Sequence, residues 1–124
     1  MAIARGRSVI NVDALTYAAS LASVASVADH PNYTFVKSDI RDYMRLNEVF
    51  LEHRPEAVMH LAAESHVDRS IDGPAKFIET NVTGTFHILE ASRKYWQSKF
   101  CPKNSVSSIL VLMKFLVACQ LIKA

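Results

Sequence analysis

Short β-rich runs alternate along this chain with helix-compatible segments, and this alternation limits the fold more than any other feature of the sequence. Strands are expected at three apolar runs, residues 8–12, 33–36 and 57–62. Helices are expected at residues 21–28, at residues 42–54 and from Pro74 to about Trp96. Strands that alternate with helices predict an α/β fold with a parallel sheet.

The long third helix has one face suited to packing against that sheet. Its small and apolar residues recur every three or four positions, at Phe77, Asn81, Gly84, Ile88, Ala91 and Tyr95. Gly84 would permit a close approach of the helix backbone. The second helix is expected to begin at Asp42, whose side chain can cap it.

Two of the expected strands deliver an acidic residue at their carboxyl ends, namely Asp13 and Asp39. Ligand sites of parallel α/β sheets lie beyond these ends. An acid that closes the second strand of a dinucleotide-binding fold accepts hydrogen bonds from the adenosine ribose, which favours NAD over NADP at Asp13. The other interpretation is that Asp13 only forms a turn, because aspartate is common there.

Composition argues against several other classes of protein. The 124 residues include 14 basic and 12 acidic ones, which are interspersed, so neither a nucleic acid nor a membrane surface is an expected partner. The apolar run at residues 109–119 suits a buried element, since a membrane span needs about 20 residues. Cys101 and Cys119 fit no close metal-ligand spacing. A cytoplasmic location is expected.

Two longer motifs carry a family resemblance. They are Asn-Val-Asp-Ala-Leu-Thr-Tyr-Ala at residues 11–18 and His-Leu-Ala-Ala-Glu-Ser-His-Val-Asp-Arg-Ser at residues 60–70. Both resemble the dTDP-glucose 4,6-dehydratases of the extended short-chain dehydrogenase/reductase family, and the likeness extends over residues 9–96. Sister epimerases and decarboxylases share the fold but differ after the His-Leu-Ala element.

The resemblance implies NAD as cofactor, dTDP-glucose as substrate and a homodimer. In that family, NAD oxidises the glucose C4 hydroxyl, water is eliminated across C5 and C6, and the hydride returns to C6. The product is a 4-keto-6-deoxy sugar nucleotide of the kind used in rhamnose biosynthesis. Related epimerases and dehydratases that use NAD remain an alternative.

The resemblance also assigns binding roles by position. The adenosine ribose would meet Asp13, Ala14, Leu15 and Thr16; the adenine would meet Asp39 and Ile40; and the rest of the dinucleotide would meet Leu61, Ala62, Ala63, Glu64, Ser65 and Thr80. Ser65 would also face the substrate. The motif departs from the family at Ala19 and Ser20, where Gly-Asn is usual, and alanine adopts a positive φ only at a cost.

No catalytic residue and no metal ligand is assigned. Tyr-x-x-x-Lys, the family's catalytic spacing, occurs at Tyr33 and at Tyr95. The first lies on an expected strand, where residues four apart are about 13 Å apart. The second comes before the place where the family's pair would occur. His60 and His66 lack a third ligand, and Glu64 and Asp68 are expected to shape a loop with Arg69.

The family's Gly-rich loop should lie about 20 residues before the ribose-binding acid, but only Gly6, Gly73 and Gly84 occur in the chain. The expected fold is therefore an incomplete Rossmann-like parallel sheet with flanking helices, in which the first strand and Gly-rich loop are missing. Residues 1–100 would form a partial NAD-binding domain. In the strand order 3-2-1-4-5-6 the missing strand is central, so we expect a split sheet and an unstable chain.

Residues 101–124 are expected to be an aberrant apolar tail. Ile109 to Leu116 can be encoded so that a shifted reading frame gives Ile-Ser-Thr-Asp-Glu-Val, a segment typical of the family, and this predicts a frameshift between about Trp96 and Ile109. The family's catalytic carboxylates are absent from the frame as read. The 124-residue chain is therefore expected to be inactive and to bind no NAD; the alternative is a noncatalytic fragment that acts through a partner.

Overall fold

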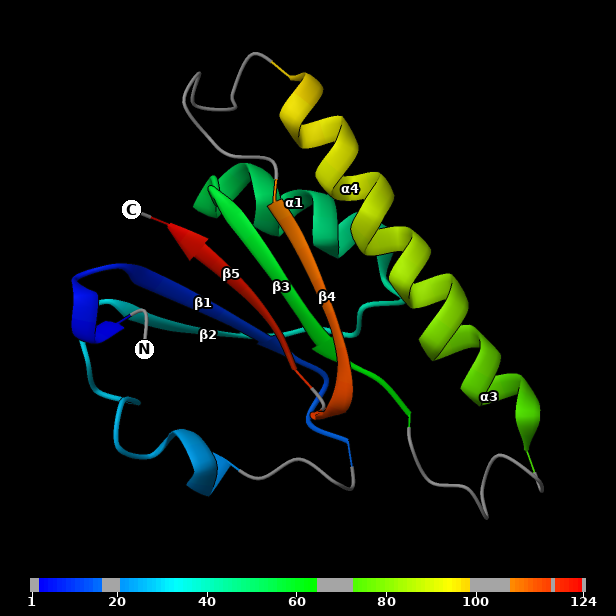
Figure 1. Ribbon diagram of the computed structural model, residues 1–124, viewed down its shortest axis with the longest axis horizontal. Coiled ribbons are helices and arrows are strands. Elements are labelled where there is room, and N and C mark those ends of the chain that lie inside the picture. The colour runs from blue at the N-terminus through cyan, green and yellow to red at the C-terminus, as the bar shows by residue number, and fades with distance from the viewer. Residues whose placement is uncertain (1–2, 17–20, 65–72, 99–107, 117, 124) are drawn as a thin grey trace.

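A computed structural model describes residues 3–16, 21–64, 73–98, 108–116 and 118–123 (Figure 1). These residues form one five-stranded sheet with the order β2-β1-β5-β3-β4. The strands are β1 (Ser8–Asp13), β2 (Tyr33–Lys37), β3 (Ala57–Ala62), β4 (Ser108–Leu116) and β5 (Ala118–Lys123). The helical segments are η1 (Ile3–Arg5), η2 (Leu21–Val24), α1 (Tyr43–His53), α3 (Pro74–Ile78), η3 (Glu79–Gly84) and α4 (Thr85–Gln97).

Four of the five strands run in the same direction. β1 pairs with β2 in parallel, and β3 pairs with β4 in parallel. β5 lies between these two pairs and is antiparallel to both β1 and β3, so β1 and β3 are parallel to each other. The α/β class and the parallel pairs are confirmed, while the described sheet as a whole is mixed because of β5.

The expected split in the sheet is wrong. β5 fills the position between β1 and β3, so the two parallel pairs join into one sheet. A central edge would leave unpaired N–H and C=O groups, which are costly away from water. The apolar tail, expected to lie outside the domain, supplies the strand that pairs them.

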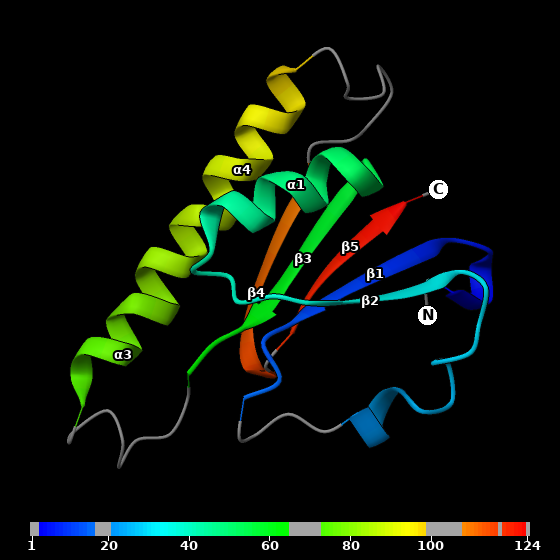
Figure 2. The same ribbon diagram turned by 180° about the vertical axis from the view of Figure 1, so that it is seen from behind.

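The described helices α1 and α4 pack together on one face of the sheet (Figure 2). Burial alternates strictly along β3: Val58, His60 and Ala62 are buried, and the residues between them are half-buried. Val12 and Phe50 belong to the same core cluster. No described helix is long and apolar enough to cross a membrane.

α1 begins as its sequence predicts. The Asp42 carboxylate accepts a hydrogen bond from the backbone N–H of Arg45 at 3.0 Å, which satisfies one of the free N–H groups of the first turn. The helix ends at Arg54, which has a left-handed backbone with φ 48°. Three apolar residues of α1 are fully buried: Leu46, Val49 and Phe50.

The long helix is confirmed, with one feature that its sequence pattern does not reveal. Its middle, η3, is a π-helix, a form that is frequent at functional sites. The predicted inward face is confirmed from Gly84 onward, since Gly84, Ile88, Ala91 and Tyr95 are buried, whereas Phe77 and Asn81 are half-buried. A Cβ atom added to Gly84 would lie 2.6 Å from Cδ1 of Ile40, so glycine lets the helix lie close to the loop after β2, and a larger residue would force the Ile40 side chain to move.

The expected helix at residues 21–28 is wrong. Only η2 (Leu21–Val24) is helical, as a 3₁₀ segment, and turns follow it. Half of the eight residues are serine or valine, which have lower helix propensity than alanine. Ala22, Ala25, Ser26 and Ala28 are exposed. No buried apolar face therefore stabilises a longer helix.

Candidate functional site

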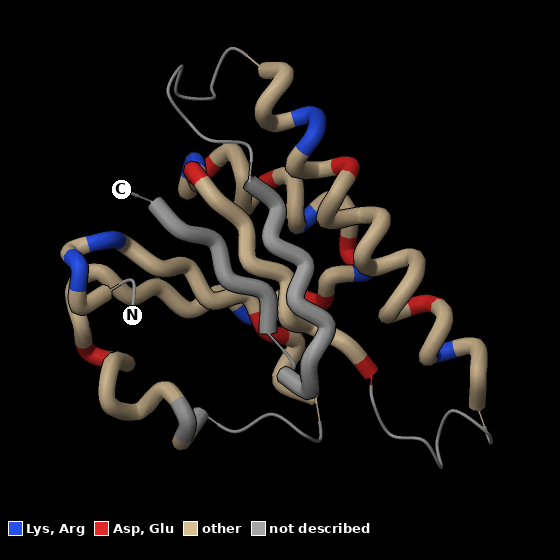
Figure 3. The backbone as a smooth tube through the Cα atoms, in the orientation of Figure 1, with Lys and Arg blue, Asp and Glu red and all other residues tan. Residues whose placement is uncertain are grey.

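The carboxyl ends of β1, β2 and β3 meet at one edge of the sheet. Asp13 closes β1, Asp39 follows β2 by two residues, and Glu64 follows β3 by two residues. The N–H of Ser38 donates to the carbonyl oxygen of Asp13 at 3.1 Å, which ties the first two ends together. Figure 3 shows acidic positions along this edge. The predicted convergence of these three strand ends is therefore present.

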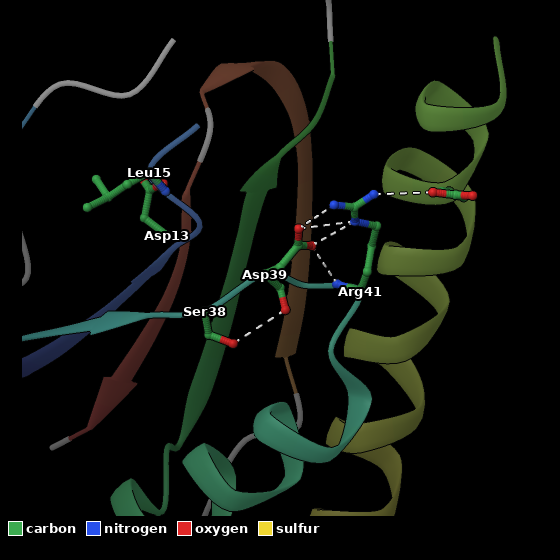
Figure 4. Close-up of polar contacts among 6 residues, drawn as sticks. Asp13, Leu15, Ser38, Asp39 and Arg41 are labelled. Atoms are coloured by element: carbon green, nitrogen blue, oxygen red, sulfur yellow. Dashed lines mark hydrogen bonds and ion pairs between the residues drawn. The ribbon is translucent and has the colours of Figure 1, made fainter. Parts of the chain in front are cut away.

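Asp13 organises the turn after β1. One of its carboxylate oxygens, Oδ1, accepts a hydrogen bond from the backbone N–H of Leu15 at 2.7 Å (Figure 4). Leu15 has a φ of 50°, a left-handed conformation that is uncommon for a residue other than glycine. Residues 13–16 are all half-buried. Both interpretations of Asp13 are thus compatible, because a carboxylate that forms a turn with one oxygen can still offer the other to a ligand. Ala19 and Ser20 lie outside the described residues.

Asp39 is held by an arginine that sequence reasoning missed. The Arg41 guanidinium donates from Nε and Nη2 to the two Asp39 oxygens, with the shortest distance 2.7 Å, and its Nη1 donates to Glu79 at 3.2 Å (Figure 4). The backbone N–H of Arg41 also donates to Asp39 at 2.9 Å. Hydrogen bonds from the Arg41 side chain lower the pKa of Asp39. This bridge connects the loop after β2 to the π-helix.

Ile40 lies beneath the long helix and is 5% exposed. Next to it, an open depression of about 480 Å³ is lined by Asp39, Arg41, Asp42, Glu79, Thr83 and His87. The depression shares only Asp39 with the expected NAD contacts. It lies on the α1 side of that residue and does not include Asp13 or the β3 exit.

The exit of β3 is fixed to the π-helix through Asn81. The Asn81 side chain accepts from the backbone N–H of Glu64 at 2.8 Å and donates to the Glu64 carbonyl at 2.9 Å. Thr80, a predicted NAD contact, is the neighbour of Asn81 on η3 and is half-buried. The contact between Glu64 and Asn81 follows directly after Leu61, Ala62 and Ala63 in the chain. Ser65 lies outside the described residues.

A buried hydrogen-bond chain continues from Asn81 into the sheet. The Thr85 hydroxyl donates to the carbonyl of Asn81 at 2.7 Å and lies 2.9 Å from Nε2 of His60. Since the single hydroxyl proton is already used, Nε2 of His60 must carry the proton and donate. Burial lowers the pKa of His60, which favours this neutral form.

His60 therefore has a structural partner, the Thr85 hydroxyl, at Nε2. No group of metal-ligating side chains occurs among the described residues, and His66, Asp68 and Arg69 lie outside them. The Tyr33 hydroxyl accepts a hydrogen bond from Asn11 at 3.0 Å, and Tyr33 and Lys37 are the first and last residues of β2. A tyrosine and lysine at opposite ends of a strand lie too far apart to act on one proton.

Two signals in the sequence point to the residues that sequence reasoning missed. Asn81 is the one polar amide on an otherwise apolar or small helix face, which indicates a specific partner. Arg41 follows Asp39 by two residues, a spacing at which an arginine in a loop can donate two hydrogen bonds to the carboxylate. The contact between Arg41 and Glu79 spans 38 positions and has no local signal.

Comparisons with known proteins match this chain to one family. A family model described as GDP-mannose 4,6 dehydratase matches residues 2–108. The chain belongs to the GDP-mannose 4,6 dehydratase family. Within that family it is similar to the dTDP-glucose 4,6-dehydratase of Shigella flexneri, with 58% identity over 91 residues, which are 73% of this chain and 25% of the relative. The corresponding enzyme of Escherichia coli K12 is 57% identical over 91 residues.

Solved structures give the same result for this dehydratase-family chain. The dTDP-glucose 4,6-dehydratase DesIV of Streptomyces venezuelae, which was solved with NAD bound, matches with a TM-score of 0.65 and 44% identity; 69% of this chain and 26% of DesIV are covered. A UDP-glucose 4-epimerase of Thermotoga maritima matches with a TM-score of 0.66 and 35% identity over 75% of this chain and 28% of its own. The chain thus spans about a quarter of the length of its curated relatives.

Proposed function

We propose that this chain forms the adenosine-binding edge of an NAD-dependent dTDP-glucose 4,6-dehydratase. The observation that carries the proposal is the meeting of three parallel strand ends at Asp13, Asp39 and Glu64, because dinucleotides bind beyond such ends. The ribose hydroxyls would bind to Asp13. The adenine would lie beside Asp39 and Ile40, and the dinucleotide would continue along residues 61–65 past Thr80.

The proposed substrate is dTDP-glucose, and the proposed reaction is its conversion to a 4-keto-6-deoxy sugar nucleotide, a step of the kind that rhamnose biosynthesis requires in the cytoplasm. Support comes from the 58% identity to the Shigella flexneri dehydratase and, among solved structures, from the 44% identity to DesIV against 35% for the epimerase. The second candidate function is sugar-nucleotide epimerisation, which the shared fold allows. The product formed distinguishes them, since an epimerase returns a hexose that still carries its C6 hydroxyl.

The test is a chimaera in which this chain's residues replace the matching 91-residue stretch of the Shigella flexneri enzyme. If the replaced residues form a working NAD edge, the chimaera binds NAD and converts dTDP-glucose to the 4-keto-6-deoxy product. A chimaera that folds but does not bind NAD would contradict the proposal.

We also propose that the chimaera is a homodimer that uses the long helix. Four exposed apolar residues recur along it at spacings of four, four and three: Ile78, Val82, Phe86 and Leu89. Phe86 is 59% exposed, which is unfavourable for a phenylalanine unless a partner covers it. Phe86→Glu should shift the chimaera to monomer in light scattering. Met44→Glu, at an exposed residue of α1, is the control that should leave the dimer intact.

The 124-residue chain by itself is proposed to be inactive. It contains no Gly-x-Gly-x-x-Gly sequence, and Tyr33 and Lys37 of the first Tyr-x-x-x-Lys match are at opposite ends of a strand. In the second match Tyr95 is buried at 4% exposure, and Lys99 lies outside the described residues. Incubation of the purified chain with NAD and dTDP-glucose should give no product. Turnover above that of a heat-treated sample would contradict this.

A further inference from the structure

β5 occupies a gap that is one strand wide between two strands that are parallel to each other. All six residues of β1 have a partner on β5, from Ser8 opposite Lys123 to Asp13 opposite Ala118. On the other side, Ala57 to His60 lie opposite Ile122 to Cys119. Both borders of the gap are therefore paired along most of their length by a single segment.

We propose that the gap between β1 and β3 is a strand-acceptor site, and that residues Ala118–Lys123 of the same chain are its occupant. In dinucleotide-binding folds this central position belongs to a parallel strand, the one that leads into the Gly-rich phosphate loop. Here an antiparallel strand takes over its structural role. The ligand class of the site is an extended peptide segment, which is bound through backbone hydrogen bonds.

The path of the chain into β5 supports a tail that reaches the site from within its own molecule. β4 lies on the far side of β3, and only residue 117 separates it from β5. The register of β4 on β3 jumps from His60 opposite Val111 to Ala62 opposite Leu116, so extra β4 residues gather at the carboxyl end of β3. They carry the chain across that end toward β5, as the curl of β4 in Figure 1 shows.

This path also affects the proposed NAD-binding edge of the sheet, an inference that rests on the proposed function. The crossing from Leu116 to Ala118 runs between the carboxyl ends of β3 and β1, because these two residues pair with Ala62 and Asp13. A dinucleotide that extends from Asp13 to the β3 exit has to cross the same place. The occupied acceptor site is therefore incompatible with a bound pyrophosphate there.

The acceptor site is tested by disulfide formation in the full 124-residue chain. Cys119 lies opposite Val12 in the antiparallel ladder, and directly opposite residues have Cα atoms about 4.5–5.5 Å apart, which suits a disulfide. The variant is Val12→Cys in a Cys101→Ser background, which removes the one other thiol. The matched control is Val36→Cys, a buried valine that pairs with Val12 from the opposite side. Its position is about 9.5 Å from Cys119, too far for a disulfide.

On mild oxidation, most Val12→Cys molecules should form an intramolecular disulfide, seen as a monomer without free thiols by mass spectrometry, while Val36→Cys keeps both thiols. Oxidation should also raise the thermal unfolding midpoint of Val12→Cys, since the new bond closes a long loop. Disulfide-linked dimers would show that β5 of a second copy is the occupant and would overturn the proposal. Equal oxidation of both variants, or of neither, would overturn it as well. None of these outcomes involves NAD, so they are independent of the proposed function.

Discussion

At the scale of single residues, the charge of Asp13 can be separated from its role in the turn. Asp13→Asn keeps an oxygen that can accept from the Leu15 N–H but removes the negative charge that the proposed ribose contact needs. A hydrogen bond to a charged group contributes about 1.5–3 kcal/mol, so NAD affinity of the chimaera should fall by roughly 10- to 100-fold. Calorimetry measures this loss. Asp29→Asn, at an exposed position, is the control, and an equal loss there would refute the assignment.

His60 predicts how stability depends on pH. Its pKa is lowered in the folded chain by burial, so the unfolded chain takes up the proton more readily. The stabilising contribution is complete above the ordinary histidine pKa of about 6.5 and is lost as the pH falls toward the lower folded-state value. His60→Gln retains a donor for Thr85 and does not titrate. Between pH 7.5 and 5, the thermal unfolding midpoint should therefore fall less in this variant than in the wild type. The difference should correspond to the loss of about one titrating group. Exposed Thr83→Ala, which removes no titratable group, should keep the wild-type slope.

At the scale of elements, the contact between the long helix and the loop after β2 depends on glycine at position 84, which has no side chain. A methyl group at Gly84 would lie 2.6 Å from Cδ1 and 2.7 Å from Cγ1 of the buried Ile40. Gly84→Ala should lower the free energy of unfolding by about 1–3 kcal/mol, as overpacking does. The cost should shrink in an Ile40→Ala background, where both atoms are gone. Urea unfolding measures it, with exposed Thr83→Ala as a control expected within about 0.5 kcal/mol.

The elements that the sequence predicted correctly are those with a strong local signal. Asp42 caps α1, and the inward stripe from Gly84 to Tyr95 follows helical periodicity, so short-range rules are sufficient. The 21–28 segment failed because alanine content alone does not form a helix that lacks a packing partner. The π-helix at η3 has no counterpart in the apolar period, and its residues contact Glu64 and Ile40, which are distant in sequence.

The same distinction holds for the candidate site. The strand ends at Asp13 and Asp39 could be predicted, because an acid after a β-rich run is visible in the sequence. The contacts that fix those ends were not predictable, because the Arg41–Glu79 bridge and the Asn81–Glu64 pair join residues 38 and 17 positions apart. Which distant residues meet is decided by the packing of the helix on the sheet.

At the scale of the whole molecule, the central question is what closes the sheet. The expected instability of the chain was derived from a gap, and β5 fills that gap, so this reason for instability no longer holds. The antiparallel direction of β5 had no signal in the sequence, because backbone pairing accepts either direction and the run at residues 109–119 carries no turn residues that would fix one. The shifted reading frame stays a prediction, which the nucleotide sequence of the gene tests.

The most direct test of this account is a calorimetric NAD titration of the 124-residue chain beside the chimaera. The chimaera should bind NAD saturably, because its strand ends are joined to a Gly-rich loop. The 124-residue chain should show no saturable binding, because β5 occupies the position of the strand that leads into that loop. Micromolar binding by the 124-residue chain, or a folded chimaera without binding, would contradict the account.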